Sequence, residues 1–287
     1  MDYHVHRYRS ACGRLDLAAR DYPADGRPTL LLMHGLTRNS ADFEPLAAHL
    51  AGHYRLIVPD QRGRGLSQWD SDPANYRPDI YAGDMFALLQ SLGIDRAMLI
   101  GTSMGGLIAM VMAAMKPDAV PALVLNDVGA VLAPEGLARI QGYVGPSGPM
   151  ASWDEAATRC RATNAVAFPD FEEADWLAFA RRTCVEQADG TIVFAYDPAV
   201  AFSVSPDTLK AEAPDLWPLW DMLTAVPTMV IRGALTDLLA METAREMEER
   251  HEAIFELVEV PNVGHAPILD EPVALAAIER FVKEHAN

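Results

Sequence analysis

The sequence has 287 residues, 23 basic and 40 acidic side chains, and a formal net charge of −17. A chain of this length can bury a substantial core, in one large domain or in a core with an insertion. The negative charge argues against partners that carry phosphate groups, so we expect neither a nucleic acid nor a membrane as a partner.

Signals for export, membrane insertion and metal binding are missing from the sequence. No apolar segment is long enough to span a bilayer, and the first residues lack the apolar stretch of a secretory signal, so we expect a cytoplasmic protein. The three cysteines, Cys12, Cys160 and Cys184, form no Cys-x-x-Cys pair. This spacing favours reduced thiols over a disulfide framework or a zinc site, and we expect no metal.

The first elements alternate between strands and helices. Residues 3–20 form two short alternating segments separated by Gly13, which predicts a hairpin. Residues 29–33 are continuously apolar, as in a strand that is covered on both faces. Helical spacing of apolar residues follows at 40–51.

The next strand, 54–59, leads into a glycine-rich loop at 60–67. A nucleotide-binding role for this loop is disfavoured because the loop lacks a Lys-Ser or Lys-Thr pair. We interpret it as a scaffold of tight turns and charged side chains that connect neighbouring loops. Residues 79–92 show a helical apolar face that ends at Gly93.

A serine lies between an apolar strand and an apolar helix in the next stretch. Residues 97–100 predict the strand, residues 107–115 a helix that is apolar on every side, and residues 122–126 the following strand. Between them, residues 101–105 read Gly-Thr-Ser-Met-Gly. Glycines at both ends of this pentapeptide allow the chain to turn sharply and expose the hydroxyl of Ser103.

This strand, Gly-x-Ser-x-Gly turn and helix resemble the nucleophile elbow of the α/β-hydrolases. The resemblance covers nearly the whole chain, because a His-Gly pair at 34–35, an Asp-x-Arg-Gly-x-Gly-x-Ser loop at 60–67 and a Gly-His pair at 264–265 also match. It implies an α/β fold with a mostly parallel central sheet, helices on both faces and a helical cap inserted after the sixth strand.

The pattern of strands and helices stops after Gly129. Residues 130–215 are rich in aromatic side chains, and we expect them to be the cap, with residues 1–129 and 216–287 as the hydrolase core. Tyr143 is our candidate in this segment for a side chain that faces the substrate. In the core, residues 228–232 and 254–260 predict strands, and residues 272–285 predict a last helix.

A serine hydroxyl needs a base to become a nucleophile at neutral pH, and histidine has a suitable pKa. Of the eight histidines, only His265 lies in a glycine-flanked loop after a late strand, where the family keeps its base. The resemblance also implies a carboxylate that orients this base. We favour Asp237, which follows an Arg-Gly pair after the penultimate strand, over Asp127, which follows the preceding strand.

The resemblance also implies an oxyanion hole, formed by the backbone amides of Leu36 and Met104. Arg38, in the same loop as Leu36, either tethers the loop or contacts a carboxylate or polar group of the substrate. The chemistry implied by these residues is a serine esterase that forms an acyl-enzyme on a small-molecule ester without a cofactor. Alternatives are a lactone or C–C (β-diketone) hydrolase and a ligand-binding protein on a hydrolase scaffold.

Overall fold

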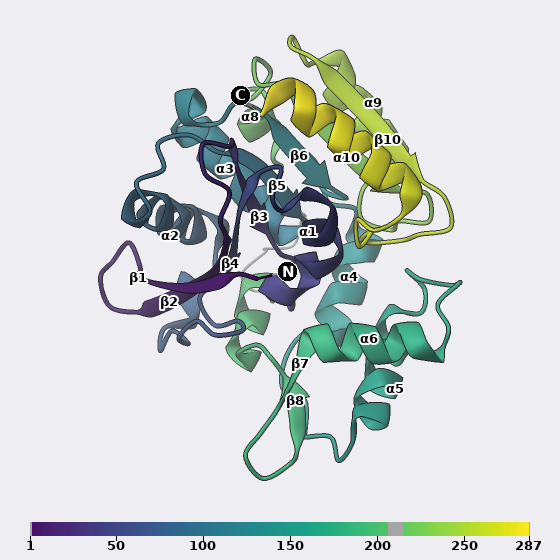
Figure 1. Ribbon diagram of the computed structural model, residues 1–287. Helices are drawn as coiled ribbons and strands as arrows, with labels where there is room; N and C mark the ends of the chain where they lie inside the picture. The colour runs from purple at the N-terminus through teal and green to yellow at the C-terminus, as the bar shows by residue number, and fades with distance from the viewer. Residues whose placement is uncertain (1, 206–214, 287) are drawn as a thin grey trace.

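The computed structural model describes residues 2–205 and 215–286 and contains an eight-stranded sheet (Figure 1). The order of its strands is β1-β2-β4-β3-β5-β6-β9-β10. Their bounds are β1 His4–Arg9, β2 Asp16–Tyr22, β3 Thr29–Met33, β4 Arg55–Asp60, β5 Met98–Thr102, β6 Leu123–Asn126, β9 Thr228–Gly233 and β10 Phe255–Val260.

The sheet is parallel from β4 to β10, whereas β1 and β2 form an antiparallel hairpin whose second strand pairs with β4. This hairpin and the strand at 29–33 confirm the expectations from the sequence. Leu30, Leu31 and Leu32 are all 0% exposed, because helices cover both faces of the sheet.

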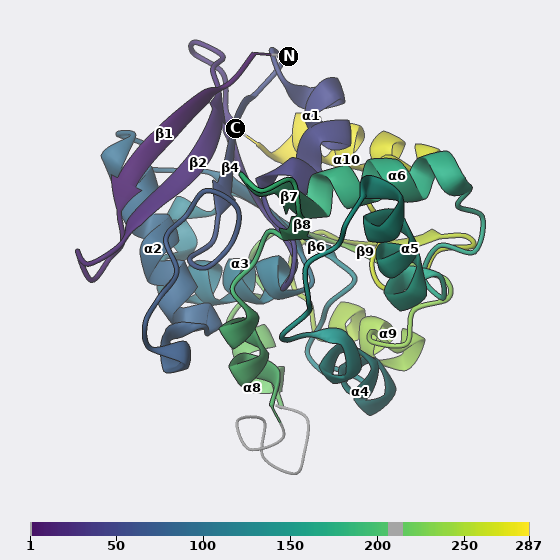
Figure 2. The same cartoon turned by 90° about the horizontal axis from the view of Figure 1, so that it is seen from below.

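Two groups of helices cover the sheet, and Figure 2 shows them on opposite sides. On one face lie α2 (Pro78–Ser91), α3 (Met104–Met115), α8 (Trp217–Trp220) and α9 (Met241–Glu249), which contribute to one buried apolar cluster. On the other face lie α1 (Glu44–Leu50) and α10 (Pro272–His285). The predicted burial of the helix after Ser103 is confirmed, since Ile108, Ala109 and Met112 are 0% exposed. Helix α9 was not expected from the sequence.

Between β6 and β9 the chain leaves the large sheet. It forms α4 (Pro134–Tyr143), α5 (Trp153–Asn164), α6 (Glu173–Thr183) and a small hairpin of β7 (Cys184–Glu186) and β8 (Ile192–Phe194), which gather in the lower part of Figure 1. The sequence pattern did not predict the hairpin. Residues 206–214 of the expected cap lie outside the described residues.

Four aromatic side chains of this region pack against one another. Phe168, Phe171, Trp176 and Phe179 have ring centroids 4.5 to 6.4 Å apart. Phe168, Trp176 and Phe179 also belong to a buried apolar cluster that includes residues of the large sheet, so these rings connect α5, α6 and the loop between them to the core. Among the helices described, none is both long and apolar enough to cross a bilayer.

Candidate active site

Ser103 occupies a sharp turn between β5 and α3, with φ 52° and ψ −115°. A positive φ is unfavourable for a residue with a side chain and is a feature of strained functional turns. Glycine is required on both sides, because a Cβ at Gly105 would overlap the carbonyl oxygen of Met33 and a Cβ at Gly101 would overlap that of Gly105. The turn therefore presents the serine hydroxyl at the carboxyl end of the central strand β5.

The register of two strands places Ser103 beside Asp127. Strands β5 and β6 are parallel, and Thr102 is opposite Asn126. Ser103 and Asp127 directly follow these two residues, so both lie side by side at the carboxyl end of the parallel strands. Asp127 also has a positive φ, 56°, and is completely buried.

His265 connects these two residues. Its Nε2 is 2.9 Å from the hydroxyl oxygen of Ser103, and its Nδ1 is 2.7 Å from Oδ2 of Asp127. With the proton on Nδ1, the ring donates to the carboxylate and can accept the serine proton at Nε2. The three residues thus form a continuous chain of hydrogen bonds.

Two further donors hold the carboxylate of Asp127. The amide of Gly233 donates to Oδ1 at 2.9 Å, and the hydroxyl of Thr236 donates to Oδ2 at 2.5 Å. Gly233 is the last residue of β9, the strand next to β6 in the sheet, and Thr236 lies in the loop that follows it. The loop in which the orienting acid was expected therefore supplies donors to Asp127.

Asp237 does not contact His265 by a hydrogen bond in the described structure. Its two carboxylate oxygens instead accept from Nε and Nη2 of Arg139, on α4, at 2.5 and 2.8 Å. These hydrogen bonds lower the pKa of Asp237. The structure therefore has Asp127, and not the expected Asp237, at hydrogen-bond distance from His265, because Arg139 binds the carboxylate of Asp237.

Part of this arrangement was visible in the sequence and part was not. Asp127 was considered, since it also follows an expected strand. The partner of Asp237 could not be foreseen, because Arg139 lies 98 positions away in the expected cap. Asn126 was also missed: its amide donates to the carbonyl of Pro267 at 2.8 Å and so ties β6 to the loop of His265.

The loop after β3 approaches Ser103 closely. A Cβ at Gly35 would lie 3.8 Å from Cβ of Ser103, so the amide of Leu36 belongs to the immediate surroundings of the hydroxyl. Within the described parts of the chain, the Leu36 amide donates no hydrogen bond. Met104 is the first residue of α3, whose first amides have no acceptor within the helix. Both predicted oxyanion donors are thus adjacent to the serine and unused.

His34 supports this loop in its neutral form. Burial lowers its pKa to about 3. Its Nδ1 is 2.8 Å from the carbonyl oxygen of Gly35, and its Nε2 accepts from the amide of Gln61 at 3.1 Å. These contacts connect the loop after β3 to the residue that follows β4.

Two cavities meet at Ser103. The larger has a volume of about 290 Å³ and an almost entirely apolar lining from both the core and α4, including Leu107, Val128, Leu137, Ile140 and Leu219. The smaller, of about 60 Å³, is lined by polar groups, including Thr37, Arg38, Asn164 and His265. Leu36 and Ile140 line both, so the two cavities are the two sides of one site.

Arg38 and Tyr143, the two candidates for contact with the substrate, both line the smaller cavity. The guanidinium of Arg38 pairs with Asp42 and lies 3.9 Å from the ring centroid of Phe179, so it also holds its loop in place. Tyr143 comes from the end of α4, and burial raises its pKa. A neutral phenol at this position can act as a hydrogen-bond donor.

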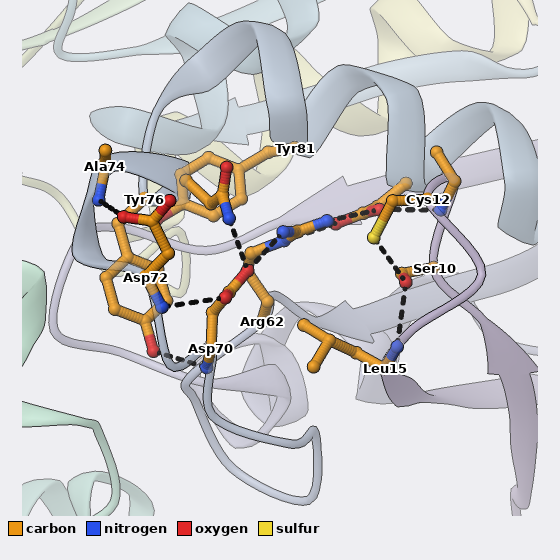
Figure 3. Close-up of polar contacts among 12 residues, drawn as sticks. Ser10, Cys12, Leu15, Arg62, Asp70, Asp72, Ala74, Tyr76 and Tyr81 are labelled. Atoms are coloured by element: carbon orange, nitrogen blue, oxygen red, sulfur yellow. Dashed lines mark hydrogen bonds and ion pairs between the residues drawn. The ribbon is translucent and has the colours of Figure 1, made fainter.

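The loop at 60–67 acts as the expected scaffold. Arg62 is buried and donates to both oxygens of Asp84 at 2.8 Å and to Asp70 at 2.7 Å, and Figure 3 shows Asp70 beside it. Asp60 accepts from the amides of Ser40 and Leu66. Among the described residues, no group of three or more His, Cys, Asp or Glu side chains is arranged to hold a metal ion.

Comparison with known proteins agrees with the observed fold. Residues 28–165 match the family model described as alpha/beta hydrolase fold. The 3-hydroxybutyrate-oligomer hydrolase of Cupriavidus necator is 37% identical over 264 residues, which cover 90% of this chain and 89% of that protein. The chain belongs to the alpha/beta-hydrolase fold family.

Two further relatives of this alpha/beta hydrolase extend over its whole length. An alpha/beta hydrolase of known structure from Novosphingobium aromaticivorans is 42% identical, with a TM-score of 0.90 and 98% of each chain covered. The 2-(acetamidomethylene)succinate hydrolase of Mesorhizobium japonicum is 28% identical over 282 residues, 98% of this chain and 96% of that protein. The chain is therefore a hydrolase, and the family indicates a small-molecule substrate.

Proposed function

We propose that this protein is a serine hydrolase that cleaves carboxylic esters through an acyl-enzyme. The observation that carries the proposal is the hydrogen-bond chain from Ser103 through His265 to Asp127, placed where an apolar and a polar cavity meet. Nucleophile, base and orienting acid are the three groups that acyl transfer to a serine requires.

The reaction begins with attack of Ser103 on the acyl carbon. Nε2 of His265 takes the serine proton, while Asp127 keeps the ring in the required tautomer and stabilises the imidazolium. Negative charge develops on the carbonyl oxygen, which the amides of Leu36 and Met104 are placed to receive. His265 then protonates the leaving alcohol, and a water molecule activated by the same histidine releases the acid.

The two cavities suggest how an ester is oriented. The leaving alcohol must reach Nε2 of His265, and this residue lines only the smaller, polar cavity. The acyl group then occupies the larger apolar cavity, which α4 and residues 203–204 help to line, and we propose that residues 130–215 act as a cap. Arg38 and Tyr143 are proposed to bind a polar end of the alcohol part.

A short hydroxy-acid ester fits both sides of this site. Its aliphatic acyl group suits the apolar cavity, and the carboxylate on its alcohol part suits a cavity with Arg38 and Asn164. The similarity to a 3-hydroxybutyrate-oligomer hydrolase supports this class, because such oligomers are joined by ester bonds. We therefore propose small aliphatic esters, including those of hydroxy acids, as substrates.

The proposal is tested with a panel of p-nitrophenyl esters, a 3-hydroxybutyrate dimer, a simple lactone and a vinylogous β-diketone, together with a fluorophosphonate probe. We expect ester turnover and a single covalent adduct on Ser103. Ser103→Ala should lose both while keeping the wild-type melting temperature, and Ser147→Ala, on an exposed loop, should keep both. Rapid lactone or diketone turnover with weak ester turnover would replace the ester proposal. A native protein without an adduct would favour a ligand-binding protein.

A further inference from the structure

Two buried arginines of the 60–67 loop have opposite surroundings. Arg62 is 1% exposed, and its guanidinium pairs with the carboxylate of Asp70, which Figure 3 labels, and with that of Asp84. Arg64 is 0% exposed, and within residues 2–205 and 215–286 no carboxylate lies at ion-pair distance from it. A buried cation without a counter-charge is costly and needs a reason.

The hydrogen bonds of Arg64 lead to the two residues of the proposed oxyanion hole. Its Nε donates to the carbonyl oxygen of Leu36 at 2.9 Å, and its Nη2 lies 3.4 Å from the sulfur of Met104. Nη1 donates to the carbonyl of Arg62 at 2.8 Å and to the hydroxyl of Tyr81 at 2.6 Å. All these partners are neutral, so none of them balances the positive charge.

Two aromatic rings also lie close to the guanidinium of Arg64. Its guanidinium carbon lies 5.4 Å from the ring centroid of Tyr76 and 5.1 Å from that of Tyr81, both of which line the apolar cavity. Ring faces stabilise a cation without neutralising it. The positive charge also reaches the loop before Leu36, since it adds to the effect of burial in lowering the pKa of His34.

We propose that Arg64 is a positioning residue for the oxyanion hole. It anchors Leu36 through the carbonyl, so that the Leu36 amide stays directed at Ser103. Its uncompensated charge favours the negative charge that develops beside Leu36 and Met104 during acyl transfer. This inference rests on the proposed function, because it concerns the tetrahedral intermediate of ester cleavage.

Such a role affects the transition state more than substrate binding, and this difference can be measured. Arg64→Met keeps an unbranched apolar side chain but removes the charge and the guanidinium donors, whereas Arg64→Lys keeps the charge and loses the planar guanidinium. We expect kcat for a p-nitrophenyl ester to fall by about 10- to 100-fold in Arg64→Met, with KM within about threefold of wild type. Arg64→Lys should lie between Arg64→Met and wild type.

A trifluoromethyl ketone, which forms a tetrahedral adduct with the serine, provides a second readout. Its inhibition constant should rise in each variant by the same factor by which kcat/KM falls. Arg62→Lys is the matched control: it perturbs the same loop from a neighbouring buried arginine that does not contact Leu36 or Met104. It should lower the melting temperature while keeping kcat within about threefold.

The inference is overturned if Arg64→Lys and Arg64→Met keep wild-type kcat, or if Arg62→Lys loses as much kcat as they do. It is also overturned if kcat falls while inhibitor affinity stays constant. If Arg64→Met does not fold, Arg64→Lys alone tests the inference: its kcat is compared with that of Arg62→Lys, and its inhibition constant with that of the wild type. Absence of ester turnover in the wild-type protein would instead refute the proposed function, so the two failures are distinguishable.

Discussion

The carboxylate of Asp237 and the guanidinium of Arg139 form a two-pronged ion pair that joins the loop after β9 to helix α4. The backbone reinforces the same junction, since the amide of Gly136 donates to the carbonyl oxygen of Asp237 at 3.0 Å. The carboxylate of Asp237 is therefore bound to α4, and the carboxylate within hydrogen-bond distance of His265 is that of Asp127.

We therefore expect unequal effects of two conservative substitutions. Asp127→Asn should lower kcat by about 10⁴-fold, because an amide at this position stabilises the wrong tautomer of His265 and cannot stabilise the imidazolium. Asp237→Asn should keep kcat within a few-fold of wild type and lower the melting temperature through the lost ion pair. Steady-state kinetics and thermal unfolding of both variants check this. A larger kcat loss in Asp237→Asn would return the acid to Asp237.

His34 should make the protein sensitive to mild acid. Its folded-state pKa is lowered by burial from 6.5 to about 3, so below pH 6.5 the unfolded chain binds a proton that the folded chain does not. The stability provided by the neutral ring is complete above pH 6.5 and is lost progressively towards pH 3. Between pH 7 and pH 5, this loss is about 2 kcal/mol at most.

Urea unfolding at both pH values, with His34→Gln as the reference, isolates this contribution. The difference in unfolding free energy between wild type and His34→Gln should shrink as the pH falls. A difference that is independent of pH would mean that His34 does not titrate between the two states.

The apolar cavity should set the length of the acyl group. Leu137 lines it from α4, and Leu137→Trp places a larger ring inside the volume of about 290 Å³. We expect kcat/KM for an octanoate ester to fall by about 10-fold or more, while that for an acetate ester changes little. Leu137→Ile, which preserves volume, should leave the ratio of the two unchanged. Equal losses for both esters would show that the acyl group lies elsewhere.

Two glycines offer opposite outcomes for the same substitution. Gly105→Ala inserts a methyl group against the carbonyl of Met33 and should lower the free energy of unfolding by about 3 kcal/mol or more. Gly142→Ala lies near the end of α4, where an added Cβ meets nothing within 4 Å. It should raise stability by about 0.5 to 1 kcal/mol, because alanine is the better helix former. Chemical denaturation of both variants measures the contrast.

Most of the fold was predictable because its signals are local. The strand at 29–33 and the helix after Ser103 are apolar on all sides, which is sufficient to identify buried elements of a parallel sheet. The glycines around Ser103 identified the elbow, since only the absence of Cβ allows its backbone approaches. The same reasoning selected His265, which lies at hydrogen-bond distance from Ser103.

The tertiary structure alone decided which carboxylate lies at hydrogen-bond distance from the histidine and which of the buried arginines of the 60–67 loop is paired with carboxylates. Asp127 and Asp237 both follow core strands, and the choice between them depends on Arg139, a distant residue that the sequence does not relate to either. Likewise, Arg62 and Arg64 look equivalent in one short loop, yet Arg62 pairs with two carboxylates, whereas Arg64 pairs with none in the part of the chain that the structure describes. Pairing of charges depends on distances between segments far apart in the chain, whereas periodicity and glycine placement are properties of neighbouring residues.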